Sequence, residues 1–300
     1  MTNDAAQAAA GPPVPRPSTL DTALLLTRVQ ALPALPRAVL DALAMLRSET
    51  SGVDECAERI AVDPALTARA LRLANSAFYG VSGRVATLRD AVHLLGRHTL
   101  GTLLTAAAVM GQFKGTGLGA NFHDVYWRHA LGVALASQAM ARQRAIDPEI
   151  AFATGLLHDI GRLALAAYFE PQHREVLAYA HEADIEPVQA ERLLLGIDHA
   201  AIGATMARQW HFPTEVVQAI AWHHLPTQMP DRGNAAQVVD LVHVSDAIAH
   251  ALDLNHLAHD MVPDLDEAAW DRVRLTPEQA ARVLRDTEHG VVALGRALGL

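Results

Sequence analysis

Residues 155–163 read GLLHDIGRL, in which the polar pair His158-Asp159 interrupts an apolar stretch of a helix expected over residues 148–168. Neighbouring residues on an α-helix point about 100° apart, so both side chains reach one ion only where a helix edge faces the site. Outward from this stretch, apolar residues follow a helical period almost throughout from Thr19 onward. No Asn-Gly or Asp-Gly turn separates alternating strands. The sequence therefore predicts an all-α fold.

Capping residues followed by proline mark three of the expected helix starts, at Asp63-Pro64, Asp147-Pro148 and Thr276-Pro277. Proline loses nothing at the first helical position, because that N–H has no partner within the helix. The apolar period predicts helices over residues 20–30, 36–48, 52–61, 64–76, 87–95, 97–112, 121–142, 148–168, 171–183, 187–195, 199–210, 213–224, 235–253, 266–273 and 277–298.

The stretch KGTGLGAN (114–121) contains three glycines and favours a boundary between two helical lobes. We expect an N-terminal lobe over residues 19–113, a linker over 114–120 and a larger C-terminal lobe, with closing helices, over 121–300. Residues 1–18 are rich in Ala, Pro and polar residues, and they are predicted to form a disordered tail.

Composition narrows the class of protein. The chain has 300 residues, a formal net charge of −9 and one cysteine, Cys56. One cysteine excludes a disulfide framework and a multi-cysteine metal cage, and it favours a reducing compartment. The acidic balance argues against a dedicated nucleic-acid-binding protein. No apolar run approaches the roughly 18–20 residues of a membrane span, so we expect a cytoplasmic protein without a membrane partner.

Histidine and aspartate side chains on separate helices can converge in a bundle core and hold metal there. Seven such residues interrupt apolar faces or helix ends: His129, His158, Asp159, His199, His223, His224 and Asp246. A single inward histidine is more often a core or surface residue than a ligand, Asp246 alone could be a buried hydrogen-bonding residue, and a His-His pair can complement a helix dipole. The joint pattern favours a metal site. The other histidines that we considered are interpreted only as core or surface residues: His93, His98, His123, His173, His181 and His211.

Several of these motifs together resemble the HDOD domain, the HD-related output domain of bacterial signalling, within the HD superfamily of metal-dependent phosphohydrolases. The matching phrases are LPALPRAV (32–39), DPALTARALRLANSAFYG (63–80), TLRDAVHLLG (87–96), GLLHDIGRL (155–163), DHAAIGATMARQW (198–210) and AIAWHH (219–224). The resemblance implies a two-lobed helical bundle, with the HD-like core in the C-terminal lobe.

The resemblance also implies a ligand set. His129, His158, Asp159 and Asp246 match the positions that hold one metal in HD enzymes, and His199, His223 and His224 match those that complete a second site. Asp159 would bridge the two. Imidazole and carboxylate ligands suit one or two divalent ions of Fe, Mn or Zn.

Two departures bear on activity. HD-GYP enzymes, which hydrolyse cyclic-di-GMP, follow the His-His pair with a glutamate and a Gly-Tyr-Pro signature, whereas this chain continues LPTQMPDRGN. Arg162 stands where those enzymes usually have a lysine. Arginine can clamp a phosphate through two hydrogen bonds, but it does not give up a proton.

The N-terminal lobe is locally basic. Residues 66–100 contain five arginines and one acid, Asp90. This is either a solvated helix surface or a docking face for an acidic partner protein or a nucleotide phosphate. In the second interpretation the contacting residues are Arg69, Arg72, Arg84 and Arg89.

The sequence thus predicts a stand-alone HDOD signal-transduction regulator that acts by contact with a signalling protein and retains an HD-type metal site. The alternative is a metal-dependent phosphodiesterase or phosphohydrolase acting on a nucleotide. A third interpretation is a sensor that binds a nucleotide without turnover.

Overall fold

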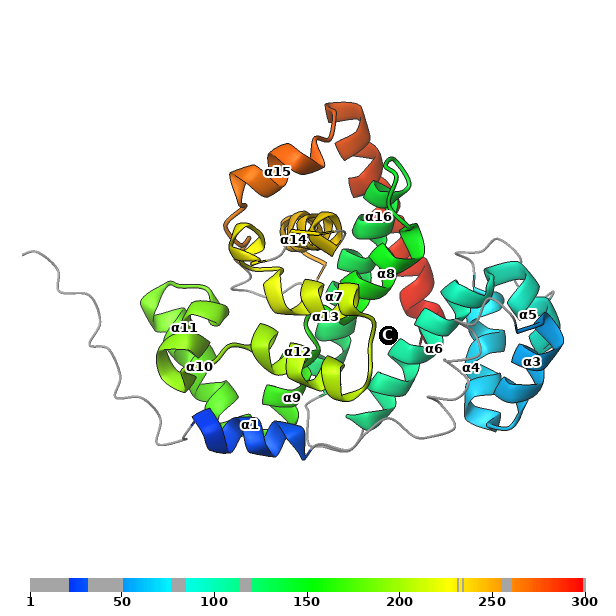
Figure 1. Ribbon diagram of the computed structural model, residues 1–300, viewed down its shortest axis with the longest axis horizontal. Coiled ribbons are helices and arrows are strands. Elements are labelled where there is room, and N and C mark those ends of the chain that lie inside the picture. Colours follow the sequence, from blue (N-terminus) through cyan, green and yellow to red (C-terminus); the bar gives the residue numbers. More distant parts are fainter. Residues whose placement is uncertain are drawn as a thin grey trace, which may run out of the picture.

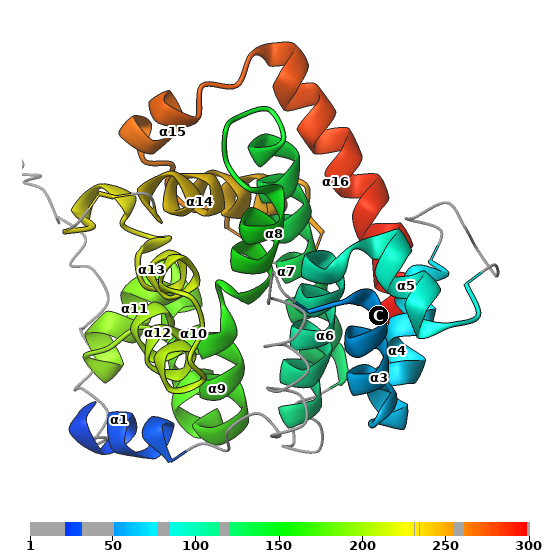
Figure 2. The ribbon, with the colours of Figure 1, turned by 45° about the vertical axis from the view of Figure 1, so that its right-hand side comes forward.

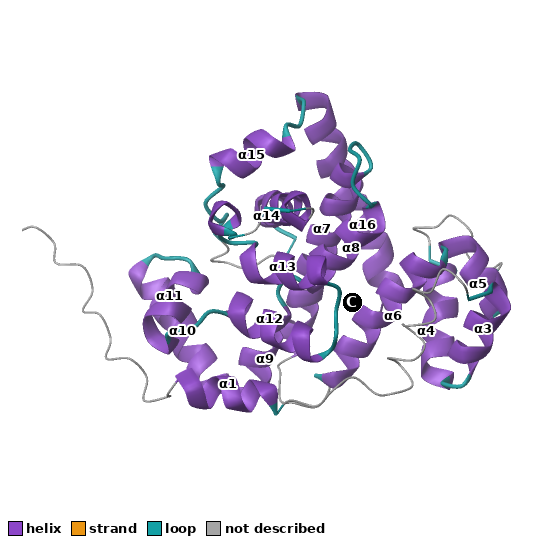
Figure 3. Cartoon of the chain, in the orientation of Figure 1, coloured by secondary structure: helices purple, strands orange, loops and turns teal. Residues whose placement is uncertain are grey.

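The computed structural model describes residues 22–31, 51–76, 85–113, 120–230, 232–233, 235–254 and 261–298. Within those ranges the chain forms helices and no strand (Figure 3), which confirms the predicted all-α fold. The elements are α1 (Thr22–Gln30), α3 (Val53–Ala61), α4 (Pro64–Ala74), α5 (Leu88–Leu95), α6 (Arg97–Gln112), α7 (Ala120–Ala141), α8 (Pro148–Leu157), α9 (Ile160–Tyr168), α10 (Glu170–Ala183), α11 (Pro187–Leu195), α12 (His199–Gln209), α13 (Thr214–Trp222), the 3₁₀ turn η2 (Pro226–Gln228), α14 (Ala235–Ala251), α15 (Glu267–Val273) and α16 (Pro277–Leu298).

Helices α3, α4 and α5 pack on one another at one end of the molecule, and α4 and α5 also pack on α6 (Figure 1). Their interior includes the fully buried side chains of Cys56, Ile60 and Leu100. The side chain of Asn75, at the end of α4, donates to the Val85 carbonyl at 2.7 Å and accepts from the Val85 N–H at 2.9 Å. These two bonds fix the end of α4 to the segment that leads into α5.

Helix α7 is the central helix of the remaining bundle, and it packs against α8, α14 and α16. Trp127, Leu131, Ala134 and Met140 are fully buried along it. A helix that is apolar on several faces can be stable in water only inside a protein. The side chains that α7 directs inward therefore lie in the core, and His129 is one of them.

Two helices cross the predicted division between the lobes. Helix α16 packs along α7 and also against α4 (Figure 2). Helix α1 packs against α12, where Gln209 Nε2 donates to the Gln30 carbonyl at 2.9 Å. Residues 114–119 of the predicted linker lie outside the described residues, and the division into lobes stays a prediction.

The three capped helix starts are confirmed, because α4, α8 and α16 begin at Pro64, Pro148 and Pro277. At α8, the Asp147 carboxylate accepts from the Glu149 N–H at 2.8 Å. The tail predicted over residues 1–18 and the helix predicted over 36–48 lie outside the described residues.

The prediction of a single helix over residues 148–168 is wrong. The chain instead forms α8 and α9, which are separated by His158 and Asp159. By length and composition alone, residues 148–168 could cross a membrane, yet 78% of their most apolar window is buried inside the protein. Their apolar character is that of core helices.

Candidate metal centre

The break between α8 and α9 brings His158 and Asp159 to one point. His158 keeps helical backbone angles (φ −53°, ψ −37°), whereas Asp159 departs from them (φ −102°, ψ 15°) and α9 begins at Ile160. In an unbroken helix the two side chains would diverge by about 100°. After the turn, His158 Nε2 lies 3.5 Å from Asp159 Oδ2. The turn could not be predicted from the apolar period, because the residues on both sides of it are buried core residues.

Two glycines of GLLHDIGRL let neighbouring helices approach the turn. A Cβ atom at Gly155 would lie 2.8 Å from the α7 backbone, and one at Gly161 would overlap the His199 carbonyl of α12. Real Cβ atoms essentially never come within 3.0 Å of such atoms. Only glycine therefore allows α7, which carries His129, and α12, which carries His199, to pack this close.

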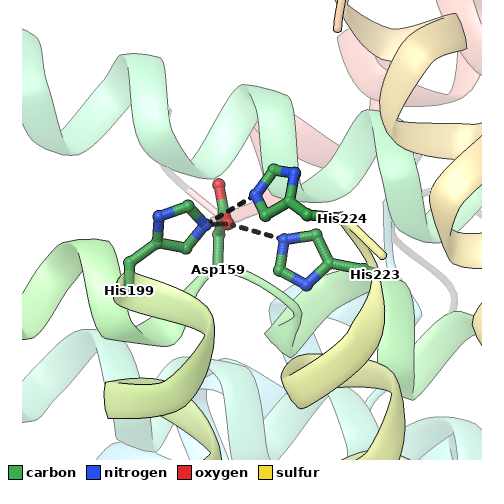
Figure 4. A group of neighbouring side chains, drawn as sticks. All are labelled: Asp159, His199, His223 and His224. Atoms are coloured by element: carbon green, nitrogen blue, oxygen red, sulfur yellow. Dashed lines mark hydrogen bonds and ion pairs between the residues drawn. The ribbon is translucent and has the colours of Figure 1, made fainter. Parts of the chain in front are cut away.

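Asp159, His199, His223 and His224 form the first ligand group (Figure 4), with one ligand atom from each within 4.8 Å of the others. Asp159 Oδ1 lies 3.1 Å from His199 Nε2 and 3.5 Å from His223 Nε2. His224 Nε2 lies 2.9 Å from His199 Nε2. Metal–ligand bonds near 2 Å place the ligand atoms about 3 Å apart, so these separations suit a common ion.

His129 and His158 form a second group on the other carboxylate oxygen of Asp159. His129 Nε2 lies 3.3 Å from His158 Nε2 and 3.0 Å from Asp246 Oδ1. Asp159 Oδ2 is 3.5 Å from His158 Nε2 and 3.9 Å from His129 Nε2. Asp159 thus offers Oδ1 to one group and Oδ2 to the other, which is the arrangement of a bridging carboxylate.

All seven side chains that the sequence singled out meet at this centre, together with one that it did not. His250 forms a third group with His129 and Asp246, and its Nε2 lies 3.5 Å from Asp246 Oδ1. His250 follows Asp246 by one turn of α14, a spacing that places both on one helix face. That spacing was visible in the sequence.

Hydrogen bonds at Nδ1 orient three of the imidazoles. His158 Nδ1 lies 2.7 Å from the Gly155 carbonyl, and His223 Nδ1 lies 2.9 Å from the Ile220 carbonyl. His199 Nδ1 lies 2.7 Å from Oε2 of Glu191, a buried carboxylate that the sequence did not single out. Each oxygen accepts from Nδ1–H and leaves Nε2 directed at the centre. Such partners fix the ring orientation and raise the basicity of a metal ligand.

Burial and charge set the protonation of these groups in the metal-free protein. Burial lowers the pKa of His158 to about 3, so its imidazole is neutral. Burial also opposes the charge of His199, but the Glu191 carboxylate, with help from Asp159, outweighs it and raises the pKa of His199 to about 9. For Asp159, burial is outweighed by Arg162 and the nearby imidazoles, which hold its pKa well below the usual range. Metal binding therefore has to displace a proton from His199.

Unsatisfied acceptors provide the test of whether a metal fits. Asp159 Oδ1, Asp246 Oδ1 and His223 Nε2 are buried and have no hydrogen-bond partner of good geometry. Leaving such atoms without a partner costs stability. A divalent cation in the first group would satisfy Asp159 Oδ1 and His223 Nε2, and one beside His129 would satisfy Asp246 Oδ1. The donor set and its burial therefore fit an ion, and the His/Asp cluster indicates a metal site.

The metal centre opens into a cavity of about 990 Å³, which is lined by Asp159, Asp246, His129, His224 and His250 among others. Arg162 lines the same cavity, with its Nε 3.1 Å from Asp159 Oδ2. The centre is thus one wall of a space large enough for a small molecule.

Two further polar residues of the cavity wall were missed or misread from the sequence. Tyr126 is buried and its hydroxyl has no partner, and burial raises its pKa well above 10, which keeps the phenol neutral. His173, which we expected to be an ordinary core or surface histidine, has two buried ring nitrogens without partners. Burial lowers its pKa to about 4. No local pattern distinguishes these two residues from core residues.

Of the four arginines predicted to contact a partner, the three that the structure describes do not line this cavity. Arg72 and Arg89 are exposed, on α4 and α5, and Arg89 forms an ion pair with Asp54 of α3. Arg69 is half-buried on α4, close to Gly111 of α6. Arg84 lies outside the described residues. Partner contact at these residues stays a prediction.

The sequence matches the HDOD domain family over residues 32–226. The chain belongs to the HDOD family. A solved HDOD domain protein of unknown function from Geobacter sulfurreducens shares the fold, with a TM-score of 0.75 and 25% identity over 93% of this chain and 98% of that one. A candidate phosphohydrolase from Shewanella amazonensis SB2B gives a TM-score of 0.71 and 29% identity, covering 91% of this HDOD protein and 97% of its own chain.

Curated relatives are longer than this HDOD protein. An uncharacterized protein of Treponema pallidum (strain Nichols) is 24% identical over 206 residues, which are 68% of this chain and 40% of that one. Ribonuclease Y of Clostridium novyi (strain NT) is 33% identical over 97 residues, which are 32% of this chain and 14% of that one. The chain therefore spans less than half the length of either relative.

Proposed function

We propose that this HDOD protein is a metal-dependent phosphohydrolase of a cytoplasmic signalling system and acts on a phosphate ester, such as a nucleotide, in the metal-centre cavity. The observation that carries this proposal is the position of the ligands in the wall of a cavity of about 990 Å³. Structural metal sites are closed by their protein ligands, whereas catalytic sites keep a position open to substrate. The likeness to a candidate phosphohydrolase at 29% identity supports the same reaction class.

The residues of the cavity have different roles in this proposed reaction. A divalent ion, when bound, supplies Lewis acidity toward a phosphoryl oxygen and toward the attacking water. Arg162 carries a fixed positive charge into the cavity, where its guanidinium can hold a second phosphoryl oxygen. The neutral Tyr126 hydroxyl supplies a further hydrogen-bond donor in the wall. Asp159 and the imidazoles would hold the ion, and their burial keeps bulk water from that side of the cavity.

Hydrolysis of two chromogenic esters tests this function. The chain, purified without chelators and supplied with Mn²⁺, is expected to release p-nitrophenolate from p-nitrophenyl phosphate or from bis(p-nitrophenyl) phosphate. Asp159→Ala should lower the rate by about 10³-fold or more, because it removes ligands from both groups at once. The matched control is Asp286→Ala, which removes an exposed acid of α16. We expect slow turnover of cyclic-di-GMP, since the Gly-Tyr-Pro signature is missing.

The second candidate is a regulator that acts by contact with an acidic signalling protein. It is favoured by the two exposed arginines Arg72 and Arg89 in the small bundle of α3 to α6, outside the metal cavity. Metal-loaded wild-type chain that hydrolyses neither ester would contradict the phosphohydrolase and favour this regulator.

A further inference from the structure

A second pocket, of about 610 Å³, lies beside α14 and shares no lining residue with the metal-centre cavity. Four of its lining residues are arginines that come from separate parts of the chain. Arg144 belongs to the turn between α7 and α8, Arg232 precedes α14, Arg272 lies in α15, and Arg274 follows it. We call this the arginine pocket. Figure 2 shows the turn after α7 together with α14 and α15 in the upper part of the molecule.

Two of the arginines share one buried carboxylate. Asp240 of α14 is 3% exposed and accepts from Arg272 Nε at 2.7 Å and from Arg272 Nη2 at 2.8 Å. Arg232 Nη2 lies 3.1 Å from the same carboxylate. This paired geometry holds α15 and the segment before α14 against α14.

The other two arginines have no carboxylate partner among the described residues. Arg274 Nε donates to the Asp271 carbonyl at 3.0 Å, which is a neutral acceptor. Asp271 is the only acidic residue besides Asp240 in the described lining. Four arginines against two acids leave the pocket with an excess of two positive charges, in a chain whose formal net charge is −9.

Arg144 adds an unsatisfied donor. Its Nε is buried and has no hydrogen-bond partner, and burial lowers the pKa of its guanidinium. A cation that loses water without gaining an anion is destabilised, so this side chain would gain from an anion in the pocket. Arg274 lines the same pocket, and its backbone N–H donates to the Trp270 carbonyl at 2.9 Å.

We infer that the arginine pocket binds the phosphate group of a small molecule, with Arg144 and Arg274 as its principal contacts. The planar guanidinium fork matches the oxygens of a phosphate, and arginine remains charged at any physiological pH. The volume falls within the range of about 300–1,000 Å³ that is usual for small-ligand sites. This inference does not depend on the proposed phosphohydrolase activity.

Calorimetric titration of the full chain with inorganic pyrophosphate tests the pocket. Arg144→Gln and Arg274→Gln should each weaken binding by about tenfold or more, since each removes a charge-assisted hydrogen bond. Arg142→Gln removes the same charge from an exposed position of the same turn and does not line the pocket, so it should keep the wild-type affinity. Arg144→Lys should retain part of the affinity. Circular dichroism of each variant establishes that it folds.

A second set of titrations distinguishes binding in the arginine pocket from binding at the metal centre, where pyrophosphate could also bind. Asp159→Ala should keep the arginine-dependent binding. Pyrophosphate binding that is lost in Asp159→Ala but unchanged in both arginine variants would overturn the inference, as would the absence of any binding. Parallel titrations with AMP and with inorganic phosphate identify the source of the phosphate. Tighter binding than that of inorganic phosphate, lost again in Arg144→Gln, supports an organic phosphate; equal affinities support a site for the free anion.

Discussion

At the metal centre two buried carboxylate oxygens, Asp159 Oδ1 and Asp246 Oδ1, have no hydrogen-bond partner, whereas in the arginine pocket the buried atom without a partner is a guanidinium donor, Arg144 Nε. The two carboxylate oxygens lie among imidazoles, and Arg144 lines its pocket together with three other arginines. Both clusters involve the same helix, α14, which carries Asp240 in one and Asp246 in the other. An unsatisfied carboxylate oxygen is completed by a cation, and an unsatisfied guanidinium N–H is completed by an anion. The type of unsatisfied atom therefore indicates which ion suits each site.

The largest expected effect is the loss of metal from Asp159→Ala. This carboxylate faces both ligand groups, so its removal should strip most of the one or two ions from the protein. Elemental analysis of protein purified without chelators measures this, with Asp240→Asn as a control in the arginine pocket that should keep the metal. Wild-type protein that is free of metal under these conditions would contradict the assignment of the His/Asp cluster as a metal site.

The next effect concerns pH in the metal-free protein. The pKa of His158 in the folded state is about 3, below its usual value of about 6.5. The unfolded chain then binds the proton first, so the stability present above pH 6.5 is lost as the pH falls toward 3. The pKa of His199 is about 9, so its contribution is present below pH 6.5 and is lost as the pH rises through 9.

Urea denaturation of the metal-free chain across this pH range measures both losses. Each slope can reach about 1.4 kcal/mol per pH unit. His158→Gln should flatten the acid side and His199→Gln the alkaline side. Bound metal should remove the alkaline slope, because it holds His199 deprotonated in the folded state. The acid-side loss should remain, since the unfolded chain still binds protons below about pH 6.5. A metal-free protein whose stability is level between pH 4 and pH 9 would contradict the assigned protonation states.

A smaller effect is expected at Glu191, whose carboxylate accepts hydrogen bonds from the backbone N–H and the Nδ1 of His199. Glu191→Gln should weaken metal binding by about 10- to 100-fold, because the carboxylate raises the basicity of the His199 imidazole. Competition with a chromogenic chelator measures the affinity. Glu175→Gln, an exposed position on α10, is the matched control. Equal affinities in the two variants would show that His199 needs no orienting carboxylate.

The smallest effect on stability is expected from Arg72→Glu combined with Arg89→Glu. Both positions are exposed, and the ion pair between Arg89 and Asp54 is more than half exposed on each side. Exposed pairs contribute about 0–1 kcal/mol, so the fold and bound metal should survive. If the protein is a contact regulator, capture of its acidic partner should weaken, and more so at low salt. A pull-down in which the double variant keeps every wild-type partner would exclude this face.

Local sequence patterns predicted much of this fold. The helix starts at Asp63-Pro64, Asp147-Pro148 and Thr276-Pro277 depend on a cap and a proline, which act within one turn of the chain. The resemblance to the HDOD domain identified seven residues that the structure brings together. The break at His158-Asp159 could not be predicted, since a buried turn between two core helices has the same apolar period as one long helix.

The all-α class, most helix boundaries and seven of the eight histidines and aspartates of the metal centre could be predicted from the sequence, because they follow from near neighbours along the chain or from recognisable motifs. Only the tertiary structure decided that Glu191 supports His199, that Tyr126 and His173 line the cavity, and that Arg144 and Arg274 share a pocket. The physical reason is that hydrogen bonding and charge act through space. Arg144 and Arg274 are separated by most of the C-terminal half of the chain, and only the packing of α14 and α15 beside the α7–α8 turn makes them neighbours.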